Sequence, residues 1–560
     1  MTNYQFTGGT ICAPATIPGT GAISIIRVSG KESLAIADKV IDTKGVPIAE
    51  TEGYRLRYGT VFEADGSVLD NVIVSVFRAP HSYTGENSVE ISCHASRFIV
   101  NKILEFLVNA GARIAAPGEF TRRAFVNGKM DLAQAEAVAD VIASQSAASH
   151  RVAMNQLKGG FSSELKALRE KLLTMTSLLE LELDFSEEDV EFASRKELGQ
   201  LVDDSLTHIR RLTASFSRGN AIKNGVPVAI VGATNTGKST LLNALLGEER
   251  AIVSDIAGTT RDTIEETLNI DGILFRFIDT AGIRETDETI EKIGIDRTFK
   301  KLGEATVVLG MTDLSRGEAA VLEDADFILS KVNEMGGVKN VAAENDGAET
   351  GGAHLAETSG APLVETDGAS LAETGGTTPA ETGGASRHGH GDGQEREVVI
   401  LVNKCDIADD FYRDDNGTDY GSGNDLGENV AEIGDNKNVN HNNNIVSLIE
   451  NKYDNCKVIP ISAKTGKGLS TLTKTLGEIG SEITGSTDET LVTNVRHYEA
   501  LVRAASALER VRAGLHIATL PPDLIAQDLR EALYHLGEIV GEISTDETLG
   551  NIFRNFCIGK

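Results

Sequence analysis

The residues best suited to chemistry lie at positions 232–239, where the sequence reads GATNTGKS. Two glycines separated by four residues and followed by Lys and Ser are typical of a phosphate-binding loop, although a Gly-rich turn without a ligand can share the pattern. Residues 228–231 predict a buried strand and residues 239–246 an amphipathic helix, as this motif requires. Backbone N–H groups would then hold a phosphate, Lys238 would neutralise its charge, and Ser239 would offer a hydroxyl to Mg²⁺.

Further motifs occur in the order that a GTP-binding domain needs. Asn403, Lys404 and Asp406 end a predicted strand, where one carboxylate can accept hydrogen bonds from both the ring N–H and the amino group of guanine. Adenine cannot donate in this way. Residues 279–282, DTAG, end another predicted strand, where a carboxylate can reach the Mg²⁺ shell and a glycine amide the γ-phosphate. Residues 462–464, SAK, follow a strand, as expected of a loop that contacts the base.

Together the motifs predict that the chain binds GTP. Thr259 and Thr260, between the phosphate loop and the next predicted strand, complete the set. The predicted GTP contacts are Asn235, Thr236, Gly237, Lys238, Ser239, Thr240, Ser254, Asp255, Ile256, Ala257, Gly258, Thr259, Thr260, Asp279, Thr280, Ala281, Gly282, Asn403, Lys404, Asp406, Ser462, Ala463 and Lys464.

The residues that would drive hydrolysis are unusual. Many small GTPases orient the attacking water with a Gln after the DTAG-type motif, but this chain has Ile283 there, which cannot hold water. Arg284, Glu285 and Glu291 are candidates to replace it, and a solvated helix start is an equally good interpretation of these charges. Asn235 could direct its amide oxygen at a cation beside the phosphates.

Composition restricts the class of protein. A chain of 560 residues with 41 % hydrophobic and 24 % charged residues is typical of a soluble protein of about three domains. No apolar run is long enough to cross a bilayer, and the N-terminus lacks the pattern of a signal peptide. The five scattered cysteines predict neither a disulfide framework nor a zinc site, so a reducing cytoplasm is expected. They are Cys12, Cys93, Cys405, Cys456 and Cys557.

The net charge of −30 argues against a general field that attracts nucleic acid, so any RNA contact must be a local basic patch. Part of this charge lies in two unusual segments, residues 336–396 and 407–444. In the first, Glu-Thr recurs every eight residues, which could indicate a small solenoid. Because large apolar residues are scarce there, we predict a disordered insertion, and the Asn- and Asp-rich second segment is predicted to be disordered too.

The remaining chain predicts several domains. Residues 1–128 show strand, helix and hairpin patterns of an α+β domain, including strands 55–62 and 68–77 across a turn at Asp65. Residues 129–221 and 486–560 show helical periodicity, and residues 222–485 alternate strands and helices around a parallel sheet. We expect one all-α domain, split in sequence by an inserted α/β P-loop GTPase domain, with two separate bundles as the alternative.

Several motifs closely resemble one family, MnmE (TrmE), the bacterial tRNA modification GTPases. They are residues 255–262 (DIAGTTRD), 279–285 (DTAGIRE), 118–125 (GEFTRRAF) and the closing tetrapeptide 557–560 (CIGK), of which the last is the most discriminating. The resemblance covers the whole chain except the two insertions.

This resemblance implies that potassium beside the phosphates substitutes for an arginine finger and pairs two nucleotide-binding domains. A cation placed there would offset the negative charge that develops in the transition state. Thr234 stands where the family usually has Pro, and Ser254 where Thr is common. Glu291 would orient the catalytic water. The implied ligands are Asn235, Ser254, Ile256 and Thr259 for K⁺, and Ser239 and Thr260 for Mg²⁺.

The resemblance also implies an N-terminal folate-binding and dimerisation domain, which would hold a tetrahydrofolate derivative in its 5,10-methylene or 5-formyl form. Arg27, Glu90, Lys129 and Lys560 would contact it, and Cys557 would lie near the one-carbon unit as a catalytic residue or stand as a buried structural thiol. The implied reaction adds an aminomethyl or carboxymethylaminomethyl group at C5 of the wobble uridine of certain tRNAs.

The implied partners are tRNA, a second copy of the chain and the FAD-bearing protein MnmG (GidA) in a heterotetramer, with no membrane and no DNA. Two other classes remain open. A ribosome-assembly GTPase would act as a switch, but it should carry an RNA-binding KH-like module, and no such Gly-x-x-Gly loop follows the GTPase motifs. A GTP-driven scaffold would have kept the fold without tRNA chemistry.

Overall fold

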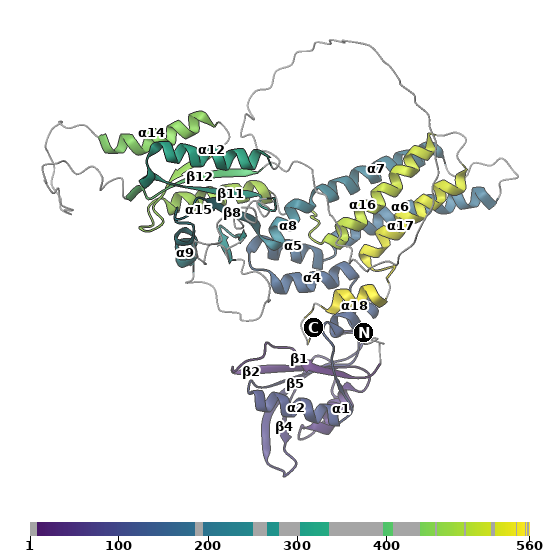
Figure 1. Ribbon diagram of the computed structural model, residues 1–560. Helices are drawn as coiled ribbons and strands as arrows, with labels where there is room; N and C mark the ends of the chain where they lie inside the picture. Colours follow the sequence, from purple (N-terminus) through teal and green to yellow (C-terminus); the bar gives the residue numbers. More distant parts are fainter. Residues whose placement is uncertain are drawn as a thin grey trace, which may run out of the picture. The chain divides into compact units, whose positions relative to one another are not determined.

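The computed structural model folds into more than one domain, as Figure 1 shows. One compact unit comprises residues 1–226, 267–276 and 475–560, and the other comprises residues 227–266 and 277–474. The residues that the structure describes are 8–184, 194–249, 266–278, 303–334, 396–406, 437–453, 456–485, 489–516, 521–544, 546–554, 556 and 559.

The N-terminal region forms a seven-stranded sheet in the order β3-β4-β5-β6-β2-β1-β7. Helices α1 (Ser33–Val40) and α2 (Arg97–Asn109) supply Leu34, Ile103 and Leu107 to the core against one face of this sheet (Figure 1). The strands are β1 (Ile11–Pro14), β2 (Ile23–Ser29), β3 (Ile41–Asp42), β4 (Arg55–Phe62), β5 (Val68–Phe77), β6 (Ser88–His94) and β7 (Arg113–Ile114), with a 3-10 turn at Ile48–Glu50 and helix α3 at Glu119–Val126.

The predicted hairpin is confirmed, because β4 and β5 pair in antiparallel register over the predicted residues. Sequence patterning missed β1, whose four residues end in Pro14 and show no alternation of polar and apolar side chains. Strand β7, only two residues long, pairs in parallel with β1. Such short strands depend on pairing with distant residues and leave little local signal.

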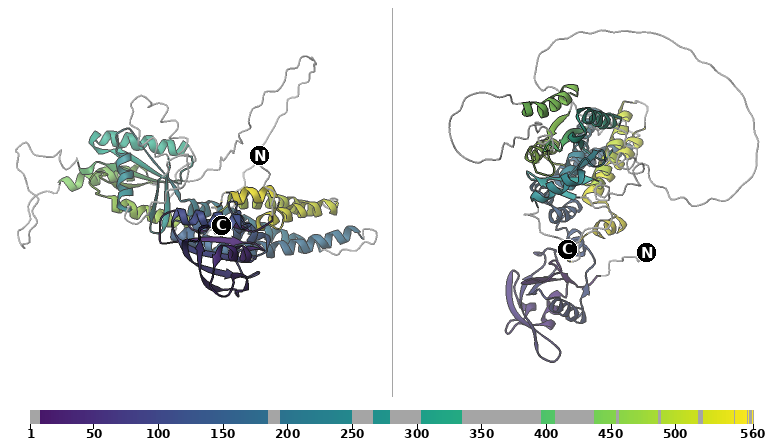
Figure 2. Two further views of the ribbon diagram at one scale, coloured as in Figure 1. Left: turned by 90° about the horizontal axis from the view of Figure 1, so that it is seen from below. Right: turned by 60° about the vertical axis from the view of Figure 1, so that its left-hand side comes forward.

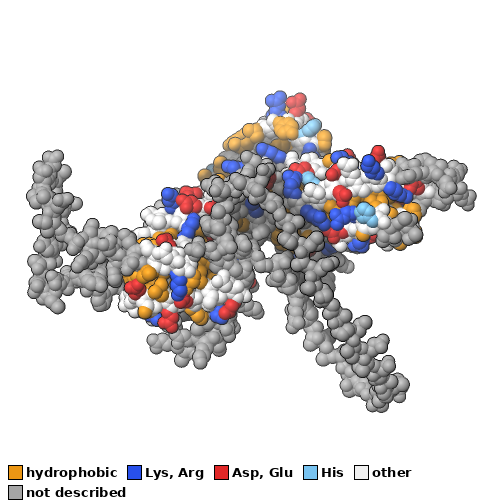
Figure 3. Space-filling model, turned by 90° about the horizontal axis from the view of Figure 1, so that it is seen from above, with side chains coloured by type: hydrophobic (Ala, Val, Ile, Leu, Met, Phe, Trp, Pro, Cys, Tyr) orange, Lys and Arg blue, Asp and Glu red, His pale blue; other side chains and the backbone are white. Residues whose placement is uncertain are grey.

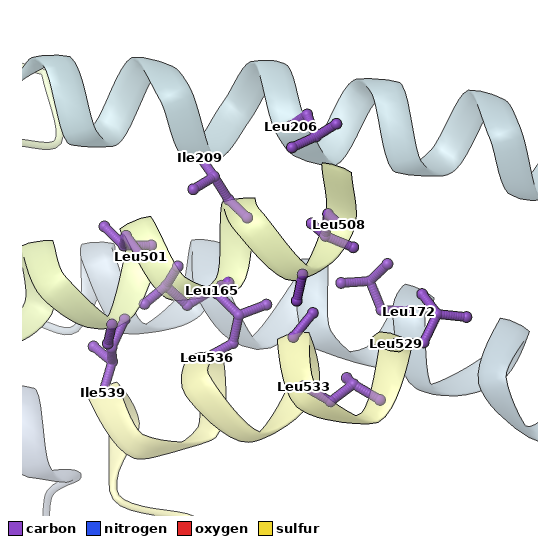
Figure 4. Packing of buried hydrophobic residues seen from close by; sticks show 14 of the residues in the cluster. Leu165, Leu172, Leu206, Ile209, Leu501, Leu508, Leu529, Leu533, Leu536 and Ile539 are labelled. Atoms are coloured by element: carbon purple, nitrogen blue, oxygen red, sulfur yellow. The ribbon is translucent and has the colours of Figure 1, made fainter. Parts of the chain in front are cut away.

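Helices from both ends of the chain share one hydrophobic core. The blue helices α6 and α7 lie beside the yellow α16 and α17 in Figures 1 and 2. Leucine and isoleucine side chains from all four helices point toward one another in Figure 4. The helices of this region are α4 (Leu132–Ala143), α5 (Ala147–Leu157), α6 (Gly160–Asp184), α7 (Arg195–Ala214), α8 (Phe216–Asn224), α16 (Val495–Leu515), α17 (Pro522–Val540) and α18 (Asp546–Arg554).

A buried charge cluster joins α4 to α16. Glu136 accepts hydrogen bonds from Arg496 Nε at 3.0 Å and Nη2 at 2.8 Å, and its Oε2 lies 2.6 Å from His497 Nε2. Arg496 also donates to the Glu538 carbonyl oxygen near the end of α17. Because Glu136 and His497 are buried, the opposite charge and the hydrogen bonds are needed to offset the loss of solvation.

A six-stranded sheet in the order β13-β12-β11-β8-β10-β9 carries the predicted phosphate loop after β8. Strands β8, β11, β12 and β13 are parallel to their neighbours in this set, as predicted. Asp271 and Gly272 both have positive φ in the tight turn between β9 and β10, a conformation typical of a two-residue hairpin turn. The elements are β8 (Val226–Gly232), α9 (Lys238–Glu249), β9 (Glu266–Ile270), β10 (Ile273–Ile278), β11 (Val307–Asp313), α12 (Glu318–Glu334), β12 (Glu397–Asn403), α14 (Lys437–Lys452), β13 (Lys457–Pro460) and α15 (Leu469–Thr484).

Both predicted insertions extended too far toward the C-terminus. Arg396 was assigned to the first, yet it is buried, donates to the Gly303 carbonyl oxygen and directly precedes β12. Helix α14 begins at Lys437, inside the second predicted insertion, because Ile445 and Ile449 pack into the core of this region. The rest of both insertions lies outside the described residues.

The surface and the helices add two observations. On the face drawn in Figure 3, acidic and basic side chains are interspersed over the described residues. In the part of the chain that the structure describes, no helix combines the length and the apolar character needed to cross a membrane.

Candidate functional site

The phosphate-loop prediction has the expected strand and helix on either side. Strand β8 ends at Gly232 and helix α9 begins at Lys238. Gly237 has φ +100°, and a Cβ atom there would collide with Asn403 Nδ2. Only glycine therefore fits this turn without displacing the neighbouring motif.

Lys238 is held inside the loop. Its Nζ donates to the carbonyl oxygens of Gly232 at 2.9 Å and Ala233 at 2.7 Å, while Thr236 Oγ1 donates to Ala233 O at 2.9 Å. Burial lowers the pKa of Lys238. An ammonium held by neutral carbonyls is placed to meet phosphate oxygens at the helix N-terminus.

Asn403 connects the phosphate loop to the base-contacting loop. Its Nδ2 donates to Thr236 O at 2.6 Å, and its Oδ1 accepts from Ala463 N at 3.0 Å. The side chain is buried, so both hydrogen bonds are protected from water. Residues from three predicted motifs are therefore fixed to one another by a single amide.

The carboxylate predicted to read guanine lies close to the same strand end. Within the described residues no hydrogen bond is donated to the Asp406 carboxylate, which is half-buried three residues after the end of β12. Ser462 is fully buried, and its Oγ accepts from Thr465 N at 3.2 Å, which orders the Ser-Ala-Lys loop. A carboxylate that still has acceptor capacity suits the paired donors of guanine.

The structure describes only part of the predicted nucleotide site. Asn235 to Thr240, Asn403, Lys404, Asp406 and the loop at Ser462 lie at the carboxyl ends of β8, β12 and β13. No group of three or more His, Cys, Asp or Glu side chains suited to a metal occurs within the described ranges. Outside the described residues lie Ser254, Asp255, Ile256, Ala257, Gly258, Thr259, Thr260, Asp279, Thr280, Ala281, Gly282, Glu291, Cys557 and Lys560.

Two predicted folate contacts form a pair on the N-terminal sheet. Arg27 of β2 and Glu90 of β6 are direct partners across the strands, and Arg27 Nε donates to Glu90 Oε1 at 2.9 Å. The guanidinium lies over the rings of Tyr83 at 5.0 Å and Phe120 at 5.7 Å. Aromatic faces and a carboxylate together fix an arginine that stays partly exposed.

Lys129 and Gly559 contact neighbouring segments. Lys129 Nζ donates to Pro80 O at 3.1 Å, in the loop that also carries Tyr83. A Cβ atom at Gly559 would collide with Pro14 O at the end of β1, so this glycine lies against that strand. Because Pro14 pairs with Ile26, Gly559 lies against the strand next to β2, which carries Arg27.

Sequence reasoning missed three residues at these sites. Tyr83 and Phe120 hold Arg27 by ring contacts, and Asp313 contacts Lys404 of the guanine motif. Phe120 lies inside a motif that marked the family, but nothing in its spacing indicates a cation partner. Asp313 ends a strand of the nucleotide sheet, and this position was the one available signal.

The parallel sheet, the phosphate loop and the linked guanine motif define a P-loop protein that binds GTP. A family model described as the GTP-binding protein TrmE N-terminus matches residues 10–129, and one described as the MnmE helical domain matches residues 132–557. The chain therefore belongs to the MnmE family of tRNA modification GTPases, as the sequence motifs indicated.

Curated relatives support this assignment along the whole chain. Proteins called tRNA modification GTPase MnmE are 44 % identical in Parabacteroides distasonis, over 98 % of this chain and 100 % of that protein, and 43 % identical in Bacteroides thetaiotaomicron and Flavobacterium johnsoniae, over 98 % and 99 %. A solved GTP-binding protein from Sulfolobus solfataricus in complex with GDP aligns with a TM-score of 0.24 and 14 % identity over 57 % of this chain and 67 % of that chain, too weakly to inform the fold.

Proposed function

We propose that this chain hydrolyses GTP and, with an FAD-bearing partner, adds an aminomethyl or carboxymethylaminomethyl group at C5 of the wobble uridine of certain tRNAs. The observation that carries the proposal is the amide of Asn403, which joins the phosphate loop to the base loop beside an available carboxylate. Similarity along 98 % of the chain to proteins called tRNA modification GTPase supports the proposed role in tRNA modification.

The nucleotide site would work by charge and position. Lys238 would neutralise the phosphates, Asp406 would select guanine, and Asn403 would keep the two loops at a fixed separation. Glu291, outside the described residues, would orient the attacking water.

Potassium and magnesium fit the oxygen donors of this loop. Asn235 is exposed with φ +62°, and its side-chain amide makes no hydrogen bond within the described residues. Its oxygen could therefore take K⁺ together with Ser254, Ile256 and Thr259. Ser239, the second residue of α9, has a hydroxyl suited to Mg²⁺, which Thr260 would share. These ions would supply positive charge at the phosphates.

The Arg27 pair fits a reduced folate. Arg27 uses Glu90 Oε1, so within the described part of the chain Glu90 Oε2 keeps acceptor capacity for the N–H and amino donors of a pterin ring. The negatively charged end of the folate would be held by the side-chain cations of Arg27, Lys129 and Lys560. A 5,10-methylene or 5-formyl tetrahydrofolate supplies a one-carbon unit there, with Cys557 close by.

We also propose how copies of the chain assemble. Leu56 and Tyr58 on β4 are 67 % and 68 % exposed, and Tyr58 pairs with the exposed Ile73 on the same sheet face. This apolar face would join two copies of the chain. The nucleotide-binding domain would be an insertion in the helical domain, and the dimer would meet MnmG in a cytoplasmic heterotetramer with tRNA as substrate.

One experiment tests the cation mechanism. GTP turnover is measured in K⁺ and in Na⁺ for the native chain and for Asn235→Ala, with Asn224→Ala as the control because Asn224 contacts Asn220 at the end of α8. We expect fast turnover in K⁺ for the native chain and the control, and slow turnover in every other case. Equal rates in both salts would refute the role of potassium.

A second experiment tests the modification. Transfer RNA from cells that carry only the native chain, Arg27→Ala or Lys238→Ala is digested, and its modified uridines are measured by mass spectrometry. We expect the C5 group only with the native chain. If both variants support full modification, the chain is a switch or a scaffold and not the modifying enzyme.

A further inference from the structure

Asp313 lies beside the guanine motif without belonging to any motif found in the sequence. It is the last residue of β11, and its Cα pairs in register with that of Asn403 on β12. Parallel strands end at the same edge of a sheet, so the residue after Asn403 can reach Asp313. Asp313 is nevertheless buried, which is unusual for an aspartate without a partner.

Both oxygens of this carboxylate are used. Oδ2 accepts from Lys404 Nζ at 2.6 Å. Oδ1 accepts from Ser315 N at 3.0 Å and from Ser315 Oγ at 2.6 Å. Ser315 thus orients the carboxylate, and the second oxygen is presented to the lysine of the guanine motif.

The Asp313 carboxylate is ionised near neutral pH. Burial acts to raise the pKa of Asp313, but hydrogen bonds from Lys404 and Ser315 outweigh burial, and the pKa lies below its ordinary value. The Asp313 side chain is 7 % exposed and that of Lys404 30 %, so one partner is fixed in the interior and the other extends toward the site.

We propose that Asp313 is a positioning residue of the guanine-nucleotide site and acts by holding Lys404 in one conformation before the nucleotide binds. Lysine has a flexible side chain and loses much rotamer freedom when it is fixed. A lysine already fixed by Asp313 would lose less freedom when base and sugar arrive, so the nucleotide would bind more tightly. The inference rests on the proposed GTP-binding function.

This role makes the effects of two substitutions dependent on each other. If Asp313 acts through Lys404, removing Asp313 should weaken nucleotide binding in the native background and do nothing further after Lys404 is removed. Because Lys404 belongs to the guanine motif and not to the phosphate loop, the turnover at saturating GTP should stay unchanged while KM rises.

The test uses the full chain with Asp313→Ala, Asp313→Asn, Lys404→Ala and the double variant Asp313→Ala, Lys404→Ala. Asp326→Ala is the control, because Asp326 accepts from Lys452 Nζ at 2.8 Å on the exposed surfaces of α12 and α14. Dissociation constants and dissociation rates of GDP are measured, together with KM and kcat for GTP.

We expect Asp313→Ala to weaken GDP binding about tenfold through faster dissociation, a change that corresponds to the loss of one ion-pair contact. Asp313→Asn should lie between it and the native chain, Asp326→Ala should bind as the native chain does, and the double variant should match Lys404→Ala. If Asp313→Ala does not fold, the nearly isosteric Asp313→Asn decides.

Two results would overturn the inference: GDP binding by both Asp313 variants equal to that of Asp326→Ala, or a double variant that loses the sum of both single effects. A native chain that does not bind GDP would instead overturn the proposed function itself, so the two failures are distinguishable.

Discussion

The nucleotide site and the Arg27 site are built in different ways. Lys238 and Asn403 bond mainly to backbone atoms of loops that follow strands, and each loop is a short continuous motif. Arg27 instead bonds Glu90, 63 residues away, and lies on two rings from other segments. A site made of strand-end loops leaves a continuous pattern in the sequence, whereas a site on a sheet face leaves isolated residues.

The difference has an energetic side. Backbone carbonyls stay in place when neighbouring side chains change, so the nucleotide site should depend on the few motif residues themselves. The Arg27 site depends on side chains that pack against one another, so its losses should be smaller and spread over more residues.

The largest effect is expected at Lys238. Lys238→Ala removes the cation held by Gly232 and Ala233, and kcat/KM for GTP should fall by at least about a thousandfold because the phosphate charge is no longer offset. Lys331→Ala is the matched control, since Lys331 donates to Glu334 at 2.6 Å on the surface of α12. Steady-state GTP turnover measures both. A Lys238 variant with a loss below tenfold would remove the distinction between the sites.

A third region extends the comparison to a larger separation in sequence. Glu136 meets His497 across 361 residues, and Glu136→Ala would leave the buried His497 and the half-buried Arg496 without their anion. The free energy of unfolding of the helical core should fall by about 3–5 kcal/mol. Urea titrations followed by circular dichroism measure this change.

The matched control for Glu136 is Glu531→Ala. Glu531 pairs with Arg510 at the surface, and its loss should cost at most about 1 kcal/mol. GDP affinity should stay unchanged in both variants, because the nucleotide site lies in the other compact unit. Equal unfolding curves for the two variants would contradict the role assigned to the buried cluster.

Glu136 should also make the free energy of unfolding depend on pH, and this effect should be somewhat smaller than that of Glu136→Ala. Burial alone would raise the pKa of Glu136, but His497 and Arg496 outweigh it and lower the pKa to about 2 from 4.5. Because the pKa of Glu136 is lower in the folded state, the ionised carboxylate stabilises the protein above pH 4.5. This stabilisation is lost as the pH falls from 4.5 toward 2. The stability difference between native chain and Glu136→Ala should therefore shrink over this interval by up to about 3 kcal/mol. A constant difference would contradict the pKa assignment.

These regions also show how far sequence reasoning extends. The strand-loop-helix at Gly237 and the hairpin turn at Asp271 were predictable, because glycine, positive φ and strand patterns are local requirements. The helical repeat of Leu165 and Leu172 predicted a buried face but not its partners from α16 and α17. Tyr83, Phe120 and Asp313 could not be assigned, since each acts on a residue that only the folded chain brings near.

The smallest expected effect lies at Tyr83 and tests the sheet-face site most finely. Tyr83→Leu removes the ring below Arg27 and should weaken binding of 5-formyl-tetrahydrofolate about fivefold, the size of one cation–π contact. Tyr83→Phe keeps the ring and loses only the hydrogen bond to Thr121, so its affinity should stay within about twofold of the native chain. Calorimetric titration of the folate measures both variants, and GTP turnover should be unchanged in each. An equal loss in the two variants would show that the hydroxyl, and not the ring, positions Arg27.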